Sequence, residues 1–179
     1  MAGTTDYAIL GILTLGEQSG YDIKKLISES IGYFWQESYG QLYPALKKMV
    51  ELEWVTMHVE KNEGKPDKKV YRITSKGRQS LKKWLEEPIH IPKIRHELLL
   101  KLFFGLQSDV AVNVKHVAEY KEKCLLYLEE LKQVKVALVQ NQKGNPASKY
   151  WLITISNGLY AIKAEIAWCD ETLTILSKE

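Results

Sequence analysis

The feature that most constrains the fold is an apolar repeat in the second half of the 179-residue chain. Five residues recur every seven positions: Val110, Val117, Cys124, Leu131 and Leu138. Three more lie three positions after members of that row: Tyr120, Tyr127 and Val134. A repeat of this kind forms one continuous stripe on an α-helix, as in coiled coils. We therefore predict one long helix that begins at Ser108 or Asp109 and ends near Gln142.

Two different surfaces could cover this stripe. A turn at 143–146 leads into a predicted last helix, 147–177, whose apolar residues also recur at helical spacing: Trp151, Ile155, Leu159, Ile162, Ile166, Leu173 and Leu176. Either the two helices cover each other as an antiparallel hairpin of one chain, or a second copy covers them in a two-fold dimer. Because one thin helical layer cannot bury so much apolar surface, we expect a homodimer.

The chain divides at a proline-flanked junction. Pro88 and Pro92 stand four residues apart, where they break helical hydrogen bonding and stiffen the chain. We expect one domain at 1–88 and a second, helical domain at 89–179 that opens with a helix at 94–106. Between positions 20 and 83 there are 13 Lys or Arg and 8 Asp or Glu, so most of the basic excess belongs to the first domain.

The first domain has the pattern of three helices, a β-hairpin and a fourth helix. Apolar spacing predicts helices at 6–15 and from Ser19 onward, and Thr74 is placed to cap a helix that runs to about residue 85. Alternation at 54–59 and the run at 70–73 predict two strands around a charged loop at 61–69. In the first strand, three side chains should share the half-buried face: Val55, Met57 and Val59.

The third helix has an ambiguous beginning. Ser38 and Gln41 have the spacing of a capping box, in which each residue binds the backbone of the other. A helix that begins at Ser38 places Pro44 in its interior, at a cost of about 3 kcal/mol. The helix therefore begins nearer Pro44, or its first turn is irregular.

The order of these elements predicts a mainly α fold with a small β wing, the winged helix-turn-helix. A helix fits the major groove of DNA, where side chains read base edges, and a lysine-rich hairpin suits phosphate. Gly40 allows close approach, Gln41 suits adenine, and Tyr43 suits phosphate or sugar. Lys47 and Lys48 suit phosphate or guanine. Three lysines are expected at the wing: Lys65, Lys68 and Lys69.

Four motifs in the first domain resemble the PadR family of bacterial transcriptional regulators. They are the stretches at 7–13 (YAILGIL), 19–23 (SGYDI), 41–46 (QLYPAL) and 71–77 (YRITSKG), in the order and spacing of that family. The rest of the chain resembles the long helical domain of its larger subgroup. The resemblance implies a cytoplasmic, homodimeric repressor that binds a palindromic operator in double-stranded DNA, with Pro44 near the start of the recognition helix.

The full set of residues expected at the DNA draws on the second helix, the third helix and the wing: Tyr21, Ser38, Tyr39, Gly40, Gln41, Tyr43, Lys47, Lys48, Lys65, Lys68 and Lys69. The family includes sensors of phenolic acids and of hydrophobic drugs. Aromatic residues of the second domain could bind such a small aromatic effector, or simply fill a core or a dimer interface. The candidates are Phe104, Tyr127, Trp151 and Trp168.

Other classes of function lack their motifs. There is no glycine-rich phosphate loop and no G-x-S-x-G elbow, and the histidines and cysteines lack the spacing of metal ligands, so we expect neither enzyme, nor cofactor, nor metal. No apolar run reaches the roughly 18 residues of a membrane span. A winged fold can also bind proteins, so the competing interpretation is an interaction adaptor without an effector.

Overall fold

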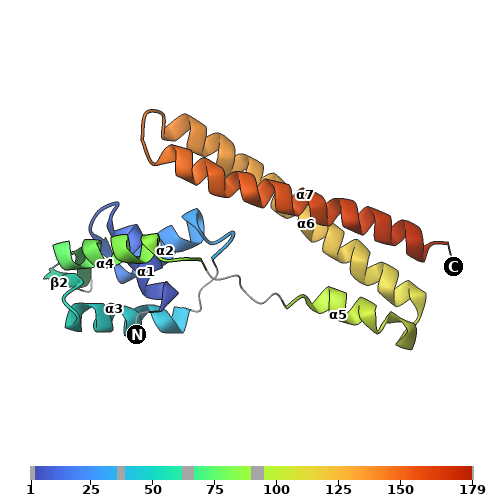
Figure 1. Cartoon of the computed structure of the whole chain (residues 1–179), viewed down its shortest axis with the longest axis horizontal. Helices are drawn as coiled ribbons and strands as arrows, with labels where there is room; N and C mark the ends of the chain where they lie inside the picture. The colour runs from blue at the N-terminus through green and yellow to red at the C-terminus, as the bar shows by residue number, and fades with distance from the viewer. Residues whose placement is uncertain (1–2, 36–38, 62–66, 90–94, 179) are drawn as a thin grey trace. The chain divides into compact units, whose positions relative to one another are not determined.

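The computed structural model of the chain describes residues 3–35, 39–61, 67–89 and 95–178. The chain divides into two compact units, 1–91 and 92–179. Both are largely helical, and the first adds a small β-sheet (Figure 1). The mainly α fold with a small β wing is therefore confirmed.

Within its described residues, the first unit combines four α-helices with one 3₁₀ turn and three short strands. The helices are α1 (Thr4–Leu13), α2 (Gly20–Ser30), α3 (Leu42–Glu51) and α4 (Ser75–Glu86), and the 3₁₀ turn η1 is Tyr39–Gln41. The strands are β1 (Gln18–Ser19), β2 (Val55–Glu60) and β3 (Lys68–Ile73). They form one antiparallel sheet in the order β1-β3-β2.

The sheet differs from the prediction at one edge and at one strand start. Strand β1 was not predicted, because two residues are too few to show alternation. Its Gln18 pairs with Tyr71 and its Ser19 with Val70. Strand β3 begins at Lys68, not at Val70, and Lys68 pairs with Glu60 of β2. Strand β3 is therefore longer than the sequence pattern indicated, while β2 is only shifted by one residue from the predicted 54–59.

The predicted half-buried face of β2 is wrong beyond its first residue. Val55 is buried, but the side chains of Met57 and Val59 are 39% and 47% exposed. Val55 pairs with Ile73 at the base of the hairpin, where both join the hydrophobic core. Beyond Val55 the edge strand β2 is exposed, although Val70 and Tyr71 of the neighbouring β3 are buried, so alternation in β2 does not bring burial.

The start of the third helix combines both alternatives left by the sequence. The chain makes the 3₁₀ turn η1 and then enters α3 at Leu42, so Pro44 is the third residue of the α-helix. The first four N–H groups of a helix have no intrahelical partner, so the proline costs no hydrogen bond there. Gln41 is the N-cap residue and makes no side-chain capping bond, and Ser38 lies outside the described residues.

The core of the first unit joins all four helices to the base of the hairpin. Its best-buried large side chains come from α1, α2, α3 and β2: Ile9, Leu10, Leu13, Ile23, Leu46, Met49 and Val55. Helix α4 begins as predicted, with the N–H of Gly77 donating to Oγ1 of Thr74 at 3.0 Å. A Cβ on Gly77 would lie 2.2 Å from the carbonyl oxygen of Trp54, so this glycine lets α4 approach the β2 backbone.

The second unit is built around a long antiparallel helical hairpin. It consists of α5 (Glu97–Phe103), the 3₁₀ turn η2 (Gly105–Gln107), α6 (Val110–Asn141) and α7 (Ser148–Leu176). Helices α6 and α7 lie side by side (Figure 1). The predicted helix at 94–106 is shorter than expected, because the α-helix ends at Phe103 and the chain continues as η2.

The central part of the apolar stripe is covered within the chain. Val117, Cys124 and Leu131 of α6 are all buried, as are Ile155, Ile162 and Cys169 of α7. Val110 at one end of the stripe and Val134 near the other are exposed, and Leu138 is half-buried. The hairpin alternative therefore accounts for the middle of the stripe, while large apolar side chains elsewhere on both helices stay uncovered.

Candidate nucleic-acid interface

A groove of about 760 Å³ lies where α2, α3 and the β-hairpin of the first unit meet. It is lined by the N-terminal turn of α2, by one side of α3, and by β2 and β3 with the residue before β3. Five residues predicted to contact DNA line it: Tyr21, Tyr43, Lys47, Lys68 and Lys69. Tyr21 and Tyr43 are well exposed. The structure thus brings α2, α3 and the wing strands together around one open surface.

The local sequence explains why α2 begins at this groove. The N–H of Asp22 donates to Oγ of Ser19 at 3.2 Å, and Ser19 Oγ in turn donates to Oδ2 of Asp22 at 2.7 Å. Backbone N of Ser19 also donates to that carboxylate, at 3.4 Å, which completes a capping box. The box fixes Gly20 and Tyr21 in the first turn of the helix, beside α3.

The charges in the groove are balanced. Three lysines line it, Lys47, Lys68 and Lys69, together with three carboxylates, Asp22, Glu51 and Asp67. Nζ of Lys68 lies 2.8 Å from Oδ2 of Asp22. That hydrogen bond lowers the pKa of Asp22 and raises the pKa of Lys68. A DNA phosphate at Lys68 would therefore compete with an existing ion pair.

Two adjacent lysines of α3 have different surroundings. Lys47 lines the groove. Lys48 is not among the groove residues, and its Nζ lies 2.6 Å from Oδ2 of Asp6, a buried carboxylate of α1. The same carboxylate accepts from the backbone N–H of Gly3 at 2.9 Å. The sequence predicted both lysines at DNA, and the structure shows in addition that Lys48 joins α3 to α1.

The remaining predicted DNA contacts lie at the start of α3 or outside the described residues. Gly40 and Gln41 are exposed, and both lie in η1, directly before α3. Ser38 and Lys65 lie outside the described residues, and only the backbone of Tyr39 is described, within η1.

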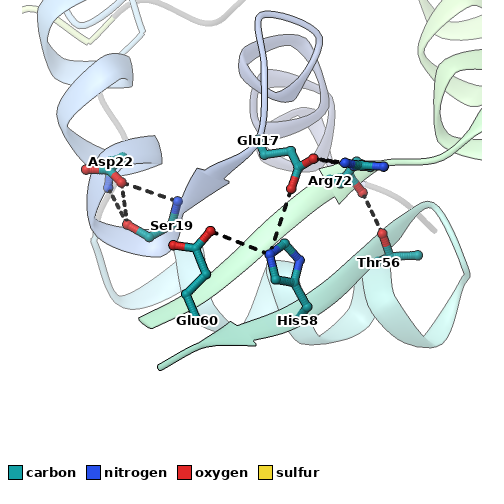
Figure 2. Close-up of polar contacts among 7 residues, drawn as sticks. All are labelled: Glu17, Ser19, Asp22, Thr56, His58, Glu60 and Arg72. Atoms are coloured by element: carbon teal, nitrogen blue, oxygen red, sulfur yellow. Dashed lines mark hydrogen bonds and ion pairs between the residues drawn. The ribbon is translucent and has the colours of Figure 1, made fainter. Parts of the chain in front are cut away.

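Sequence reasoning missed a polar cluster on the other face of the sheet. Figure 2 shows His58 between two carboxylates, with Nε2 3.9 Å from Oε2 of Glu17 and 3.6 Å from Oε1 of Glu60. Nε of Arg72 donates to Oε1 of Glu17 at 2.5 Å. These strand positions alternate with the groove-lining Met57, which places them on the opposite face. The cluster depends on Glu17 next to β1, the strand that the sequence did not reveal.

The four candidate effector residues do not converge in the single chain. Trp151 and Trp168 are 17 positions apart on α7, which at about 1.5 Å per residue separates them by roughly 25 Å. Trp168 packs against the core formed by Leu98, Val117 and Cys169. Phe104 is exposed after α5, and Tyr127 is half-buried on α6.

The second unit has its own shallow hollow of about 550 Å³ between α5 and α6. His96 and Tyr120 line it and are joined by a hydrogen bond of 3.2 Å between Nε2 and the hydroxyl. The Tyr120 hydroxyl donates to Oε2 of Glu165 on α7 at 3.3 Å. Three cationic side chains complete its rim: Arg95, Lys101 and Lys123.

Two other kinds of feature are absent from the described residues. Within these ranges, no three His, Cys, Asp or Glu side chains are grouped so that they could hold a metal ion. No helix in the described part of the chain is both long and apolar enough to cross a membrane.

Two family profiles match the chain in succession. Residues 9–83 match the Transcriptional regulator PadR-like family, and residues 94–177 match the family Virulence activator alpha C-term. The negative transcriptional regulator PadR of Bacillus subtilis (strain 168) is 40% identical over 99 residues, which are 55% of this chain and 54% of that protein. That match spans about half the length of the relative.

Solved structures match over nearly the whole chain. Bacillus subtilis PadR in complex with operator DNA has a TM-score of 0.85 at 28% identity, covering 97% of this chain and 99% of that chain. The same protein in complex with p-coumaric acid has a TM-score of 0.77 at 27% identity, covering 96% and 98%. The Vibrio cholerae virulence activator AphA has a TM-score of 0.76 at 30% identity, covering 97% and 98%.

These relatives are regulators of transcription and not enzymes, as the sequence predicted. The order of the two matching profiles is also the order of the two units described above. Because both profiles match and a 30% identical relative matches over nearly its full length, the protein belongs to the PadR-like family of transcriptional regulators.

Proposed function

We propose that the protein is a cytoplasmic, homodimeric transcriptional repressor that binds a palindromic operator through residues 1–88. The groove that joins α2, α3 and the wing strands is the main observation in favour, because it gathers five of the eleven predicted contact residues. The similarity to Bacillus subtilis PadR, whose structure is known with operator DNA, supports the same role.

In this proposal α3 enters the major groove with its N-terminal end foremost. Gly40 and Gln41 are exposed there, so they face base edges, and Gln41 suits adenine. Tyr21, Tyr43, Lys47 and Lys69 contact the sugar-phosphate backbone on the flanks. Lys48 has a structural role with Asp6 and contributes no phosphate contact.

Residues 89–179 provide the dimer interface in this proposal. Among the described residues of the second unit, large apolar side chains are exposed along every helix. The most exposed on α5, η2, α6 and α7 are, in that order, Phe103, Leu106, Leu126 and Tyr160. Covering them with a second copy gives an isologous interface and places two α3 helices about 34 Å apart, one turn of DNA.

A small aromatic effector releases the repressor in the same proposal. Bacillus subtilis PadR is known in complex with p-coumaric acid, a phenolic carboxylic acid. The hollow in the second unit is lined by three cations and the phenol of Tyr120, together with the carboxylates of Glu97 and Glu119, of which Glu97 pairs with Lys101. Arg95 and Lys123 are therefore the cations proposed to meet the carboxylate of such a molecule. Titrating p-coumaric acid into the operator complex tests this step, and an unchanged operator affinity would rule it out for this compound.

DNA binding itself is tested with a duplex selected from a random library. Lys47→Ala should weaken binding on all sequences and reduce the salt slope by about one unit. Gln41→Ala should instead relax base preference at one position, by about 1–3 kcal/mol. Lys82→Ala on α4 is the matched control, because Lys82 is exposed and is not a groove residue. Failure to select any duplex with salt-dependent affinity would favour the interaction adaptor.

A further inference from the structure

The ring of Tyr43 lies directly against the first residue of α2. A Cβ built on Gly20 would be 2.8 Å from Cε1 of Tyr43 and 3.4 Å from both Cζ and the hydroxyl oxygen. Gly20 is a helical residue and is not among the glycines with positive φ. The backbone would therefore accept any side chain at this position, and it is the tyrosine ring that requires a glycine.

The same ring also lies close to the sheet. Tyr71 of β3 is buried and lines the groove together with Tyr43. The pKa of Tyr71 is raised first by burial and then by the charge that Tyr43 would carry when ionised. Tyr43 of α3 thus lies beside both α2 and β3, yet its side chain is 62% exposed.

We propose that Gly20 is a positioning residue for DNA binding, because the absence of a side chain at this position leaves room for the Tyr43 ring to pack against the start of α2. This inference rests on the proposed function of the groove. A surface tyrosine without a packing contact samples several rotamers, and fixing one of them on DNA costs conformational entropy. Packing against Gly20 holds the Tyr43 hydroxyl at the groove before DNA binds, so the side chain loses less conformational entropy on binding.

The test compares four proteins on one selected operator at fixed salt: the parent, Gly20→Ala, Tyr43→Ala and the double variant. Gly20→Ala displaces the ring and should weaken binding about tenfold, the loss expected for one hydrogen bond to a charged phosphate. Tyr43→Ala should cause a similar loss. The double variant should bind like Tyr43→Ala alone, because no ring remains to be displaced.

Stability separates this role from a structural one. Alanine is a better helix former than glycine, so Gly20→Ala should unfold at the same temperature as the parent or higher. Gly11→Ala is the matched control: Gly11 lies in α1, a Cβ there meets nothing within 4 Å, and it is not a groove residue. That variant should keep full operator affinity.

A second measurement does not need DNA. If the Tyr43 ring lies against Gly20 in solution, its ring current should contribute to the Gly20 Hα chemical shifts in the parent, and Tyr43→Ala should remove that contribution. Two results would overturn the inference: full affinity of Gly20→Ala, or losses that multiply in the double variant. If no duplex that binds the parent protein is found, the proposed function fails, while the ring-current result still decides whether Tyr43 packs against Gly20.

Discussion

The two units bury their apolar residues in different ways. The first unit closes a core around side chains from four helices and the hairpin base, among them Ile9, Leu10 and Leu46, each with 0% exposure. The second unit buries mainly one line of side chains between α6 and α7, to which Leu98 of α5 adds at one end. On their outer faces Leu126 and Tyr160 stay 69% and 77% exposed.

This difference follows from the shape of the elements. Short helices that cross can surround a core from several directions, whereas two long helices that lie side by side contact each other along one line only. The first unit can therefore reach stability within its own chain. The second unit gains from a partner that covers its outer faces, and changes on its inner and outer faces should have different consequences.

The largest effect is expected for Leu131→Glu on the inner face. Leu131 is 2% exposed within the chain, so the variant places an unpaired carboxylate between α6 and α7. We expect a loss of about 4 kcal/mol or more in the free energy of unfolding of the hairpin. Circular dichroism should show reduced helicity, while the first unit retains its own transition.

Leu126→Glu on the outer face is the counterpart. It should leave helicity intact and weaken the dimer by about 2 kcal/mol or more, seen as a monomer in sedimentation at micromolar concentration. The comparison breaks if Leu131→Glu dissociates the dimer without unfolding, or if the parent protein is monomeric at these concentrations.

The next largest effect concerns the ion pair inside the first unit. Lys48→Met leaves the buried carboxylate of Asp6 without its lysine, so we expect a loss of about 1–3 kcal/mol in stability. Lys47→Met should leave stability unchanged and weaken DNA binding. Thermal unfolding and operator affinity, measured on both variants, should show these opposite profiles. Equal loss of operator affinity in both variants would show that Lys48 also contributes to DNA binding, as the sequence predicted.

The order of elements was predictable from the sequence because each helix carries its own signal. Apolar spacing located α6 and α7, and Thr74 marked the start of α4. The missing strand β1 has no signal of its own, because Gln18 and Ser19 are extended only through their pairing with β3. Likewise, alternation in β2 gives the direction of side chains but not whether another element covers them.

The candidate site was predictable in its elements but not in its pairings. The sequence identified Tyr43 and Lys47 by their place on α3, since 3.6 residues per turn fix which residues share a face. It could not reveal that Asp6, 42 positions earlier, binds Lys48, or that Asp22 binds Lys68. Such partners depend on how helices and strands meet in three dimensions.

The two units should also respond to opposite extremes of pH. Hydrogen bonds from Lys68 and Ser19 hold the pKa of Asp22 below its ordinary 3.8, so its carboxylate stabilises the first unit above that pH. This stability is lost as the pH falls through the lower, folded value. Burial raises the pKa of Cys169 from 9.0 to about 11, so the second unit loses stability as the pH rises between these values.

Hydrogen exchange measured residue by residue separates the two responses. Asp22→Asn should flatten the acid response of the first unit, and Cys169→Ala should flatten the alkaline response of the second. An unchanged alkaline response in Cys169→Ala would show that other groups, such as the buried Cys124 thiol whose pKa is also raised, carry it.

The smallest effect is expected at a strained residue of the first unit. Glu53 lies between α3 and β2 with φ of 58°, and it is the only non-glycine residue with positive φ among those the structure describes. Glycine adopts this conformation without steric cost, so Glu53→Gly should raise the unfolding temperature of the first unit by about 2 °C.

The change also removes the ion pair with Lys76, where Nζ lies 2.9 Å from Oε2 of Glu53. Lys76→Met removes that pair but keeps the strained backbone, and it should lower the unfolding temperature slightly. If Glu53→Gly also lowers it, the ion pair outweighs the strain. The hydrogen bond from Thr74 Oγ1 to the Glu53 carbonyl, 2.7 Å long, involves the backbone and should survive in both variants.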